Sequence, residues 1–464
     1  MNNITRRSFL KTSAALAVTS TGVAHAQASA SEKHPLEAGV AVRDITPPPG
    51  VPMWGYGDRK GPATRTLDPL YGRAVVLKSP EMTVAIATMD LGRVPMLNAL
   101  NRIRDRVKAK GIDHVVFTSS HTHGGPIMED EEAPHCKSIE DALGACIEDA
   151  AKNLRPVRIG IGKTSIDISH NRRKILQDGR CLMMWRNEKR EPTVPVDHEA
   201  SIIKVEGYDG VPLAILVHYA CHPVVLGPDN LEYTADYVGE MTRLVKQETG
   251  ADCFFLQGGC GDINPYLDKT PRNQDGVEAM RGAGKACADA VLKALGAIET
   301  HVVEDSALAI HEKSVEVGTR WDFSNPDVQN VLRGVYGPRF DSILKQITPE
   351  LPLPLTVLLL NREIALAFVP GEFFVQYQLD LKTGAPVKHA LLVGYANDFH
   401  AYFPTIGGAA AGGYGGTMAT YVGVGAGDKF ITEARIAAGK LAGRIRDTVE
   451  MQDFKSLETD PTGA

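Results

Sequence analysis

The chain has 464 residues, of which 43% are hydrophobic and 23% are charged. This composition is typical of a globular protein with room for one large domain or two. Its 50 basic residues stand against 56 acidic ones, so it lacks the basic excess of nucleic-acid-binding proteins, and we expect no nucleic-acid partner. The seven cysteines form no C-x-x-C motif. A Cys253–Cys260 pair and free thiols throughout both remain open.

Residues 1–26 carry the pattern of an export signal. Arg6 and Arg7 precede a short apolar stretch at 12–23, and Ala24-His25-Ala26 fits an A-x-A cleavage site. The paired arginines are typical of a twin-arginine signal peptide. The apolar stretch is shorter than the ~20 residues that span a bilayer, and no later stretch is long and apolar enough. We therefore expect export to the periplasm by the twin-arginine machinery, with no transmembrane segment in the mature chain.

The first segments after this signal have the order of a βαβ unit. Apolar patterns predict strands at 38–46, 73–78 and 83–91. Apolar residues at helical spacing predict a helix at 97–110, and a β-branched run predicts a strand at 113–118. A helix between two strands favours a parallel pair covered by that helix.

The strand at 113–118 leads into the sequence FTSSHTHGGP, which places His121 and His123 one residue apart. Alternate side chains of an extended segment share a face, so both imidazoles can point into one cleft. One metal ion with room for water would explain this pattern. Histidines that are only solvated or hydrogen-bonded would explain it too.

Further strands are predicted at 157–168 and 200–205, with Arg172 and Arg173 in a loop between them. Two adjacent arginines can hold an anionic group of a substrate. They can equally be solvated or form salt bridges.

A nearly continuous apolar run predicts a buried strand at 212–217, which leads into His218 and then His222. Side chains that follow the strands of a covered α/β sheet converge beyond the sheet edge. His222, which is fixed by the next proline, is the better ligand candidate, whereas we expect His218 to pack within the strand.

The segment 254–257 is a third apolar strand, and it opens into the glycine-rich loop 258–265. This loop lacks the helix and lysine of a P-loop, so we interpret it as backbone that approaches a ligand or metal. Asp262 lies in the loop, and Asp236 precedes a helix that ends near residue 249. Both aspartates can orient the histidines or serve as caps and turns.

The last part of the chain brings two more strand ends. The segments 355–360 and 363–368 are predicted to form a hairpin that leads into Pro370-Gly371-Glu372. A strand at 391–395 leads into the sequence NDFHAY, which ends at Tyr402. The other predicted elements are helices at 139–154, near 236–249, up to about 295, at 326–344 and at 430–449, and β-type alternation at 301–317.

Two glycine-rich loops are candidates for the walls of a pocket. The segment 53–57 combines Trp54 and Tyr56 with glycines, and either lines a pocket or packs on the surface. The segment 407–416 carries Tyr414 and is flexible enough to act as a lid. With no internal repeat or linker, we expect a single large mixed α/β domain over 35–452, with a metal site at the C-terminal ends of its strands.

The four motifs HTHGGP, CHP, PGEF and NDFHAY, in this order, resemble the neutral/alkaline (non-lysosomal) ceramidase family, specifically its N-terminal catalytic domain. The resemblance runs from about Gly39 to Tyr402. It implies a zinc ion held by His121, His222, Glu372 and Tyr402, the tyrosine lying five residues after an asparagine as in the family.

The same resemblance implies roles for neighbouring residues. Zinc would activate a water that attacks a carbonyl, and His123 would stabilise the oxyanion. We assign catalysis to His123, Asp262 and Asn264, and substrate binding to Arg172, Arg173 and Asp236.

This sequence departs from the family pattern in three respects. Asn264 stands where the family has a serine beside the zinc, which excludes a serine nucleophile there. We expect the family's C-terminal β-sandwich domain to be absent. No hydrophobic arm for lifting a sphingolipid from a membrane is evident, so the resemblance alone does not make ceramide the substrate.

Three hypotheses remain. The first is an exported zinc-dependent hydrolase of an amide or N-acyl bond. The second is a metal-dependent lyase or hydrolase that acts on an acidic oligosaccharide, and the third is a non-catalytic periplasmic binding protein. The ligand would be a small molecule, a lipid or a glycan.

Overall fold

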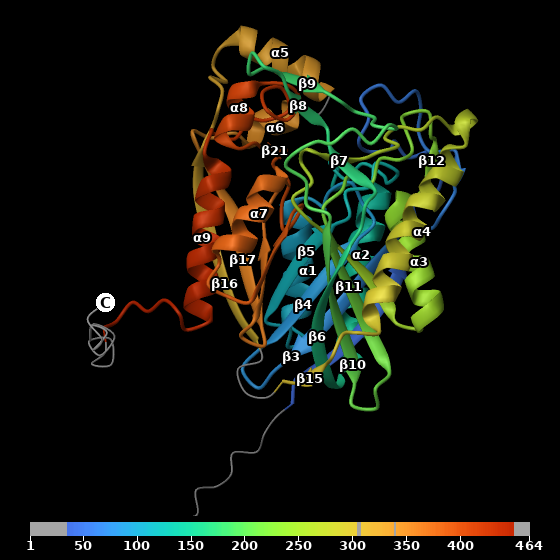
Figure 1. Cartoon of the computed structure of the whole chain (residues 1–464), viewed down its shortest axis with the longest axis vertical. Helices are drawn as coiled ribbons and strands as arrows, with labels where there is room; N and C mark the ends of the chain where they lie inside the picture. Colours follow the sequence, from blue (N-terminus) through green and yellow to red (C-terminus); the bar gives the residue numbers. More distant parts are fainter. Residues whose placement is uncertain (1–34, 304–307, 338–339, 450–464) are drawn as a thin grey trace, which may run out of the picture. The chain divides into compact units, whose positions relative to one another are not determined.

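The computed structural model describes residues 35–303, 308–337 and 340–449. The predicted signal peptide and the end of the predicted domain at 452 lie outside them. The described residues form a mixed α/β fold in which two sheets lie face to face between helices (Figure 1).

The larger sheet has nine strands in the order β13-β11-β10-β6-β1-β3-β4-β5, with β15 paired to β6. Its pairs β4·β5 and β11·β13 are parallel, and the other pairs are antiparallel. Its strands are β1 (Glu37–Asp44), β3 (Tyr71–Lys78), β4 (Thr83–Met89), β5 (His114–Ser119), β6 (Arg155–Ser165), β10 (Glu199–Gly207), β11 (Pro212–Tyr219), β13 (Asp252–Gln257) and β15 (His301–Val302).

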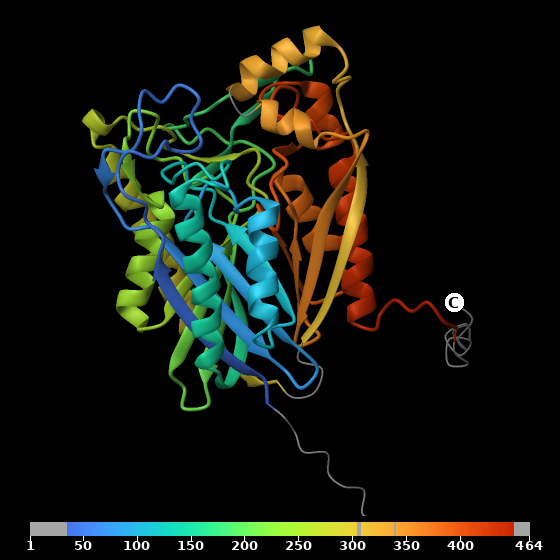
Figure 2. The ribbon, with the colours of Figure 1, turned by 180° about the vertical axis from the view of Figure 1, so that it is seen from behind.

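Four helices cover one face of the larger sheet (Figure 2). They are α1 (Leu97–Lys108), α2 (Pro134–Lys152), α3 (Asp236–Thr249) and α4 (Gly276–Leu295). Alternation within the strands explains this layer: Val217 packs toward the helices, whereas Leu216 packs toward the second sheet.

The second sheet has the order β16-β17-β18-β20, made by β16 (Leu308–Gly318), β17 (Glu350–Leu360), β18 (Ile364–Phe368) and β20 (His389–Val393). Leu358 and Leu366 face the larger sheet. Leu359 and Ala367 face the helix layer that contains α7 (Val375–Gly384) and α9 (Ala426–Leu441). Each sheet is therefore covered on one face by helices and on the other face by the second sheet.

Short elements complete the fold near the ends of the long strands. The two-stranded pairs are β2 (Arg65–Thr66) with β12 (Glu232–Tyr233), β7 (Ser169–Asn171) with β14 (Ile263–Pro265), β8 (Arg173–Ile175) with β9 (Cys181–Met183), and β19 (Glu372–Phe373) with β21 (Tyr402–Phe403). The short helices are η1 (Arg272–Gln274), α5 (Pro326–Tyr336), α6 (Phe340–Gln346) and α8 (Ile406–Ala411).

The fold class was predicted correctly, and so were the parallel βαβ unit β4-α1-β5 and the β17–β18 hairpin. Asn361 and Arg362 close that hairpin with positive φ angles of 50° and 56°. Some boundaries were wrong. The predicted loop 407–416 overlaps α8, and α9 ends at Leu441 rather than 449 because Gly443 leaves the helical region with φ +67°.

All seven cysteines are free, which excludes the Cys253–Cys260 pair in this structure. His218 packs within β11, as predicted, and its Nε2 atom donates to the carbonyl oxygen of Leu392 at 2.7 Å. Within residues 35–449, apart from the two short undescribed gaps, no helix combines the length and the apolar character needed to cross a bilayer.

Candidate metal centre and substrate pocket

His121 and His222 lie just beyond the ends of β5 and β11, and each ring is fixed by a backbone carbonyl. The Nδ1 atom of His121 contacts the oxygen of Gly92 at 2.7 Å, and that of His222 contacts the oxygen of Ile263 at 3.0 Å. Because a carbonyl oxygen can only accept, Nδ1 carries the proton in both rings. Each Nε2 atom therefore keeps its lone pair for another partner.

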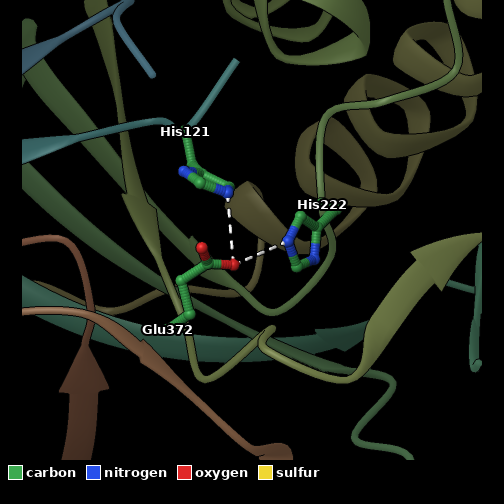
Figure 3. Close-up of side chains that lie close together, drawn as sticks. All are labelled: His121, His222 and Glu372. Carbon is green, nitrogen blue, oxygen red and sulfur yellow. Dashed lines mark hydrogen bonds and ion pairs between the residues drawn. The ribbon is translucent and has the colours of Figure 1, made fainter. Parts of the chain in front are cut away.

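Both lone pairs converge on the same carboxylate oxygen (Figure 3). Oε2 of Glu372 lies 3.1 Å from Nε2 of His222 and 3.4 Å from Nε2 of His121. All three side chains are buried, and one possible ligand atom from each lies within 4.8 Å of the others. Two Nε2 lone pairs and a carboxylate oxygen that face one another favour a cation between them, and two imidazoles with a carboxylate form a donor set suited to zinc.

The protonation of this group favours metal binding. Burial, followed by Arg172, lowers the pKa of His222 to about 4 against the opposing effect of Glu372. Burial opposes ionisation of Glu372, but His121 and His222 outweigh it and lower the pKa of the carboxyl. Near neutral pH the site thus offers a neutral imidazole from His222 beside a carboxylate.

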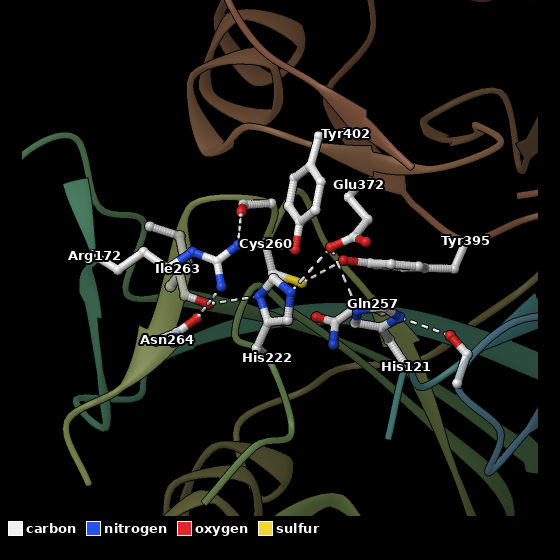
Figure 4. Close-up of polar contacts among 12 residues, drawn as sticks. His121, Arg172, His222, Gln257, Cys260, Ile263, Asn264, Glu372, Tyr395 and Tyr402 are labelled. Atoms are coloured by element: carbon white, nitrogen blue, oxygen red, sulfur yellow. Dashed lines mark hydrogen bonds and ion pairs between the residues drawn. The ribbon is translucent and has the colours of Figure 1, made fainter. Parts of the chain in front are cut away.

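Tyr402, the fourth predicted ligand, lies directly beside Glu372 (Figure 4). The parallel pair β19·β21 places the two residues opposite each other. The guanidinium of Arg172 donates from one nitrogen to the Tyr402 hydroxyl at 2.9 Å. Burial raises the pKa of this phenol, whereas Arg172 acts in the opposite direction.

Gln257, at the end of β13, is a site residue that was not predicted from the sequence. Its Nε2 atom donates to the carbonyl oxygens of Ser120 and Cys221, each at 3.0 Å. These are the residues immediately before His121 and His222. One fully buried amide thus ties together the backbone that carries both histidines. A glutamine at a strand end next to the glycine-rich loop was the available sequence signal.

His123 lies in the same cavity but has a different environment from His121. Both of its ring nitrogens are buried and have no hydrogen-bond partner among the described residues. Burial, followed by the neighbouring His121 and His222, lowers the pKa of His123 well below its usual value. A Cβ atom at Gly55 would lie 2.4 Å from Cγ of His123, so this close approach needs a glycine.

The cavity beside these residues has a volume of about 360 Å³. It is lined by Gly55, Tyr56, His123, Arg172, Trp185, His222, Val224, Asn264, Lys269, Tyr402 and Tyr414. The aromatic loop 53–57 therefore lines a pocket, as one of the two alternatives predicted. Trp185 and Lys269 had not been singled out from the sequence.

The two arginines that were predicted to bind substrate together are separated by the structure. Arg172 lines the cavity, whereas Arg173, in β8, donates to the backbone oxygens of Gly408, Gly412 and Tyr414. Alternating side chains in the β7–β8 segment point to different sides. Arg173 thus holds the loop that carries Tyr414 instead of facing the cavity.

Asp236 and Asp262 have structural contacts, and neither lines the cavity. The carboxylate of Asp236 accepts from the backbone N–H groups of Val225, Leu226 and Tyr237. That of Asp262 accepts from the Asn171 amide and the Val375 backbone. Of the two alternatives predicted, the cap and turn contacts therefore hold, because backbone carbonyls contact the histidine rings. These contacts also leave Asp236 buried away from any substrate in the cavity.

Asn264 does line the cavity, where its Oδ1 atom accepts from Arg172 at 3.0 Å. Its Nδ2 atom donates to Asp268 at 2.9 Å. Asn264 thus joins Arg172 to a buried acid.

The described residues thus form a two-sheet α/β domain with a histidine–carboxylate cluster beyond its strand ends, and solved structures share the fold. Neutral ceramidase from Pseudomonas aeruginosa aligns with a TM-score of 0.70 and 18% sequence identity, over 90% of this chain and 76% of that chain. A ceramidase complexed with C2 aligns with a TM-score of 0.69 at the same identity and coverage. No protein-family model matches the sequence. The likeness is one of fold.

Proposed function

We propose that this protein is a zinc-dependent hydrolase of an amide or N-acyl bond. The observation that supports this most is the convergence of two Nε2 lone pairs and one carboxylate oxygen at the edge of a cavity of about 360 Å³. Two histidines and one carboxylate leave room on zinc for a further ligand. The two ceramidase structures of the same fold favour an amide substrate.

A zinc ion held by His121, His222 and Glu372 would supply a Lewis acid and lower the pKa of water to ~7. The chain's own residues then orient the substrate. His123 has two unpartnered ring nitrogens in the cavity, and as a neutral imidazole it offers one N–H to a substrate oxygen. Its other nitrogen remains an acceptor.

Arg172 and Tyr402 form the opposite side of the same cavity. Arg172 holds the Tyr402 hydroxyl with a hydrogen bond of 2.9 Å, which fixes the phenol beside Glu372. A phenol held by a guanidinium can donate its proton and is stabilised as the phenolate once it has done so. This pair can therefore supply a proton to a leaving amine.

The test is a hydrolysis screen with purified, zinc-loaded protein against N-acyl lipids and N-acyl amino acids. The double variant His121→Ala/His222→Ala serves as the blank. We expect one zinc per chain and hydrolysis for the wild type, and neither for the double variant, because losing the metal removes several kcal/mol of charge stabilisation. Metal content near one per chain in the double variant would refute the site.

A second candidate is a lyase that acts on an acidic glycan, and the contact between Arg172 and Tyr402 favours it. Once it has lost its proton, a phenol held by arginine would act as the base that removes the proton beside a uronate carboxylate. An unsaturated product with new ultraviolet absorbance would identify this reaction. Free amine would identify hydrolysis.

We further propose that the protein acts in the periplasm, on the basis of the twin-arginine pattern in residues 1–26. Replacing Arg6 and Arg7 with lysine should retain the precursor in the cytoplasm. Cell fractionation measures this outcome, and unchanged periplasmic protein would contradict it.

A further inference from the structure

The charged residues that line the cavity are cations. Among the eleven lining residues, Arg172 and Lys269 carry a full positive charge and none is acidic. Both cations lie against Trp185: the Arg172 Cζ atom is 5.0 Å from its ring centroid and the Lys269 Nζ atom is 4.4 Å from it. The two charges thus flank one indole ring on the wall of the cavity.

The neighbouring acid balances only one of these charges. Nζ of Lys269 lies 2.8 Å from Oδ2 of Asp268, and this carboxylate is buried behind the wall. The hydrogen bonds of Arg172 go to the oxygens of Asn264, Gly261 and Tyr402, none of which belongs to a carboxylate. Its Nε atom is buried without a partner among the described residues. Arg172 therefore makes no direct ion pair with a carboxylate among the described residues, and Glu372 acts on its charge only through space.

The rest of the lining argues against a long apolar ligand. Val224 is the only aliphatic side chain among the lining residues, whereas four aromatic rings line the cavity. Apolar ligands are usually enclosed by many hydrophobic side chains, with few polar ones. Aromatic faces beside cations suit a compact ligand with a ring and an anionic group.

We infer that Lys269, Trp185 and Arg172 form a carboxylate subsite, and that the substrate is a small amide or glycan that carries one carboxylate near the reacting bond. A wall with one cation that lacks a direct carboxylate partner matches a monoanionic carboxylate better than a doubly charged phosphate. This inference rests on the proposed function for the reaction, but the anion binding that it assigns can be measured without turnover.

The kinetic test compares acids with their neutral twins. N-acetyl amino acids are paired with their carboxamides, and uronate disaccharides with neutral disaccharides. For whichever acid is turned over, Lys269→Met should lower kcat/KM by ~10-fold or more, mainly through KM, because a hydrogen bond to a charged group is lost. The neutral twin should be unaffected, and Lys269→Arg should restore most of the loss.

Lys285→Met is the matched control. Lys285 is an exposed lysine on α4 that pairs with Asp289, so this variant removes the same charge away from the cavity. Equal losses for the acid and the neutral twin in Lys269→Met, or a wild-type preference for the neutral twin, would overturn the subsite.

The binding test separates this inference from the hydrolase proposal. N-acetylphenylalanine and its carboxamide are titrated into the full chain by calorimetry. Tighter binding of the acid that depends on Lys269 supports the subsite even if no amide is hydrolysed. If Lys269→Met binds the acid with the same affinity as the wild type, the subsite is refuted. Equal affinity is the result expected for a carboxylate held by metal alone.

Discussion

We call His121, His222, Glu372 and Tyr402 the floor of the cavity, which His222 and Tyr402 line directly, and we call Trp185, Lys269 and Tyr414 its rim. The floor lies just beyond the ends of long strands from both sheets, and carbonyl oxygens, Gln257 and the β19·β21 pair fix its side chains. The rim comes from loops. Tyr414 follows Gly412 and Gly413, whose φ angles are positive, and contacts the floor through the ring of Tyr402.

The different ways in which the floor and the rim are held suit them to metal binding and substrate binding, respectively. Floor atoms that are fixed by backbone contacts can hold a metal in one geometry, because little reorganisation is needed. Rim atoms are carried by loops, which ring contacts and the hydrogen bonds of Arg173 hold in place, so they can set the fit of the substrate. We therefore expect changes in the floor to affect metal content or kcat, and changes in the rim to affect KM.

His123 lies between the two and gives the largest expected effect. In His123→Gln, kcat should fall by ~10²–10³-fold, since one donor to a developing oxyanion is lost, while zinc content stays at one per chain. Kinetics and metal analysis measure the two quantities. His135→Gln, which changes a histidine that contacts the Ile127 carbonyl instead, is the control. Zinc loss in His123→Gln would place this residue in the floor.

His218 in β11, the strand that leads to His222, should make the free energy of unfolding depend on pH. Burial lowers the pKa of His218 to about 4. A histidine whose pKa is lower in the folded state stabilises the fold fully above its unfolded pKa of ~6.5. This stability is lost as the pH falls through the folded pKa. From pH ~7 to ~4 the wild type should lose about 3 kcal/mol more unfolding free energy than His218→Gln.

Urea unfolding at both pH values measures this loss. Gln keeps an N–H for the Leu392 carbonyl and does not titrate. The exposed His301, changed to Gln, should leave the pH dependence unaltered. An identical pH dependence in wild type and His218→Gln would show that His218 is not held neutral.

A change at Gln257 tests whether metal binding depends on the hydrogen bonds that join the backbone before His121 to the backbone before His222. Gln257→Leu should weaken zinc binding by ~10–100-fold, the usual effect of losing a residue that orients metal ligands. Competition with a chelator measures the affinity. Gln378→Leu changes another buried glutamine, which contacts Gly259 and Asp197, and should cost stability without this loss of affinity. Equal affinity losses in both variants would indicate general destabilisation.

The smallest expected effect lies in the rim. Gly415 has φ +74°, and a Cβ atom there would lie 2.9 Å from Cδ1 of Tyr402. Gly415→Ala should raise KM a few-fold, roughly 1 kcal/mol of strain, with zinc content unchanged. Gly179→Ala has a similar φ of +83° with nothing within 4 Å, so it should leave KM unaltered. A fall in kcat alone for Gly415→Ala would break the division between floor and rim.

The elements of the fold were largely predictable, because burial on both faces leaves a continuous apolar run, as in β11 and β13. The ends of the helices and strands were less predictable. Gly443 ends α9 early, and α8 forms within a segment of glycine and alanine that has no periodic pattern. The histidines and Glu372 were predictable because each follows a strand, and strand ends meet at one sheet edge.

The sequence by itself determined the four strand ends and the residues that they carry, since apolar periodicity and the residues after it are local properties. Only the tertiary structure decided which neighbours take part. In the tertiary structure Arg172 lines the cavity and Arg173 does not. Asp236 and Asp262 contact backbone N–H groups, and Lys269 lies against the ring of Trp185. These outcomes depend on contacts between segments far apart in the chain, and no local pattern encodes such contacts.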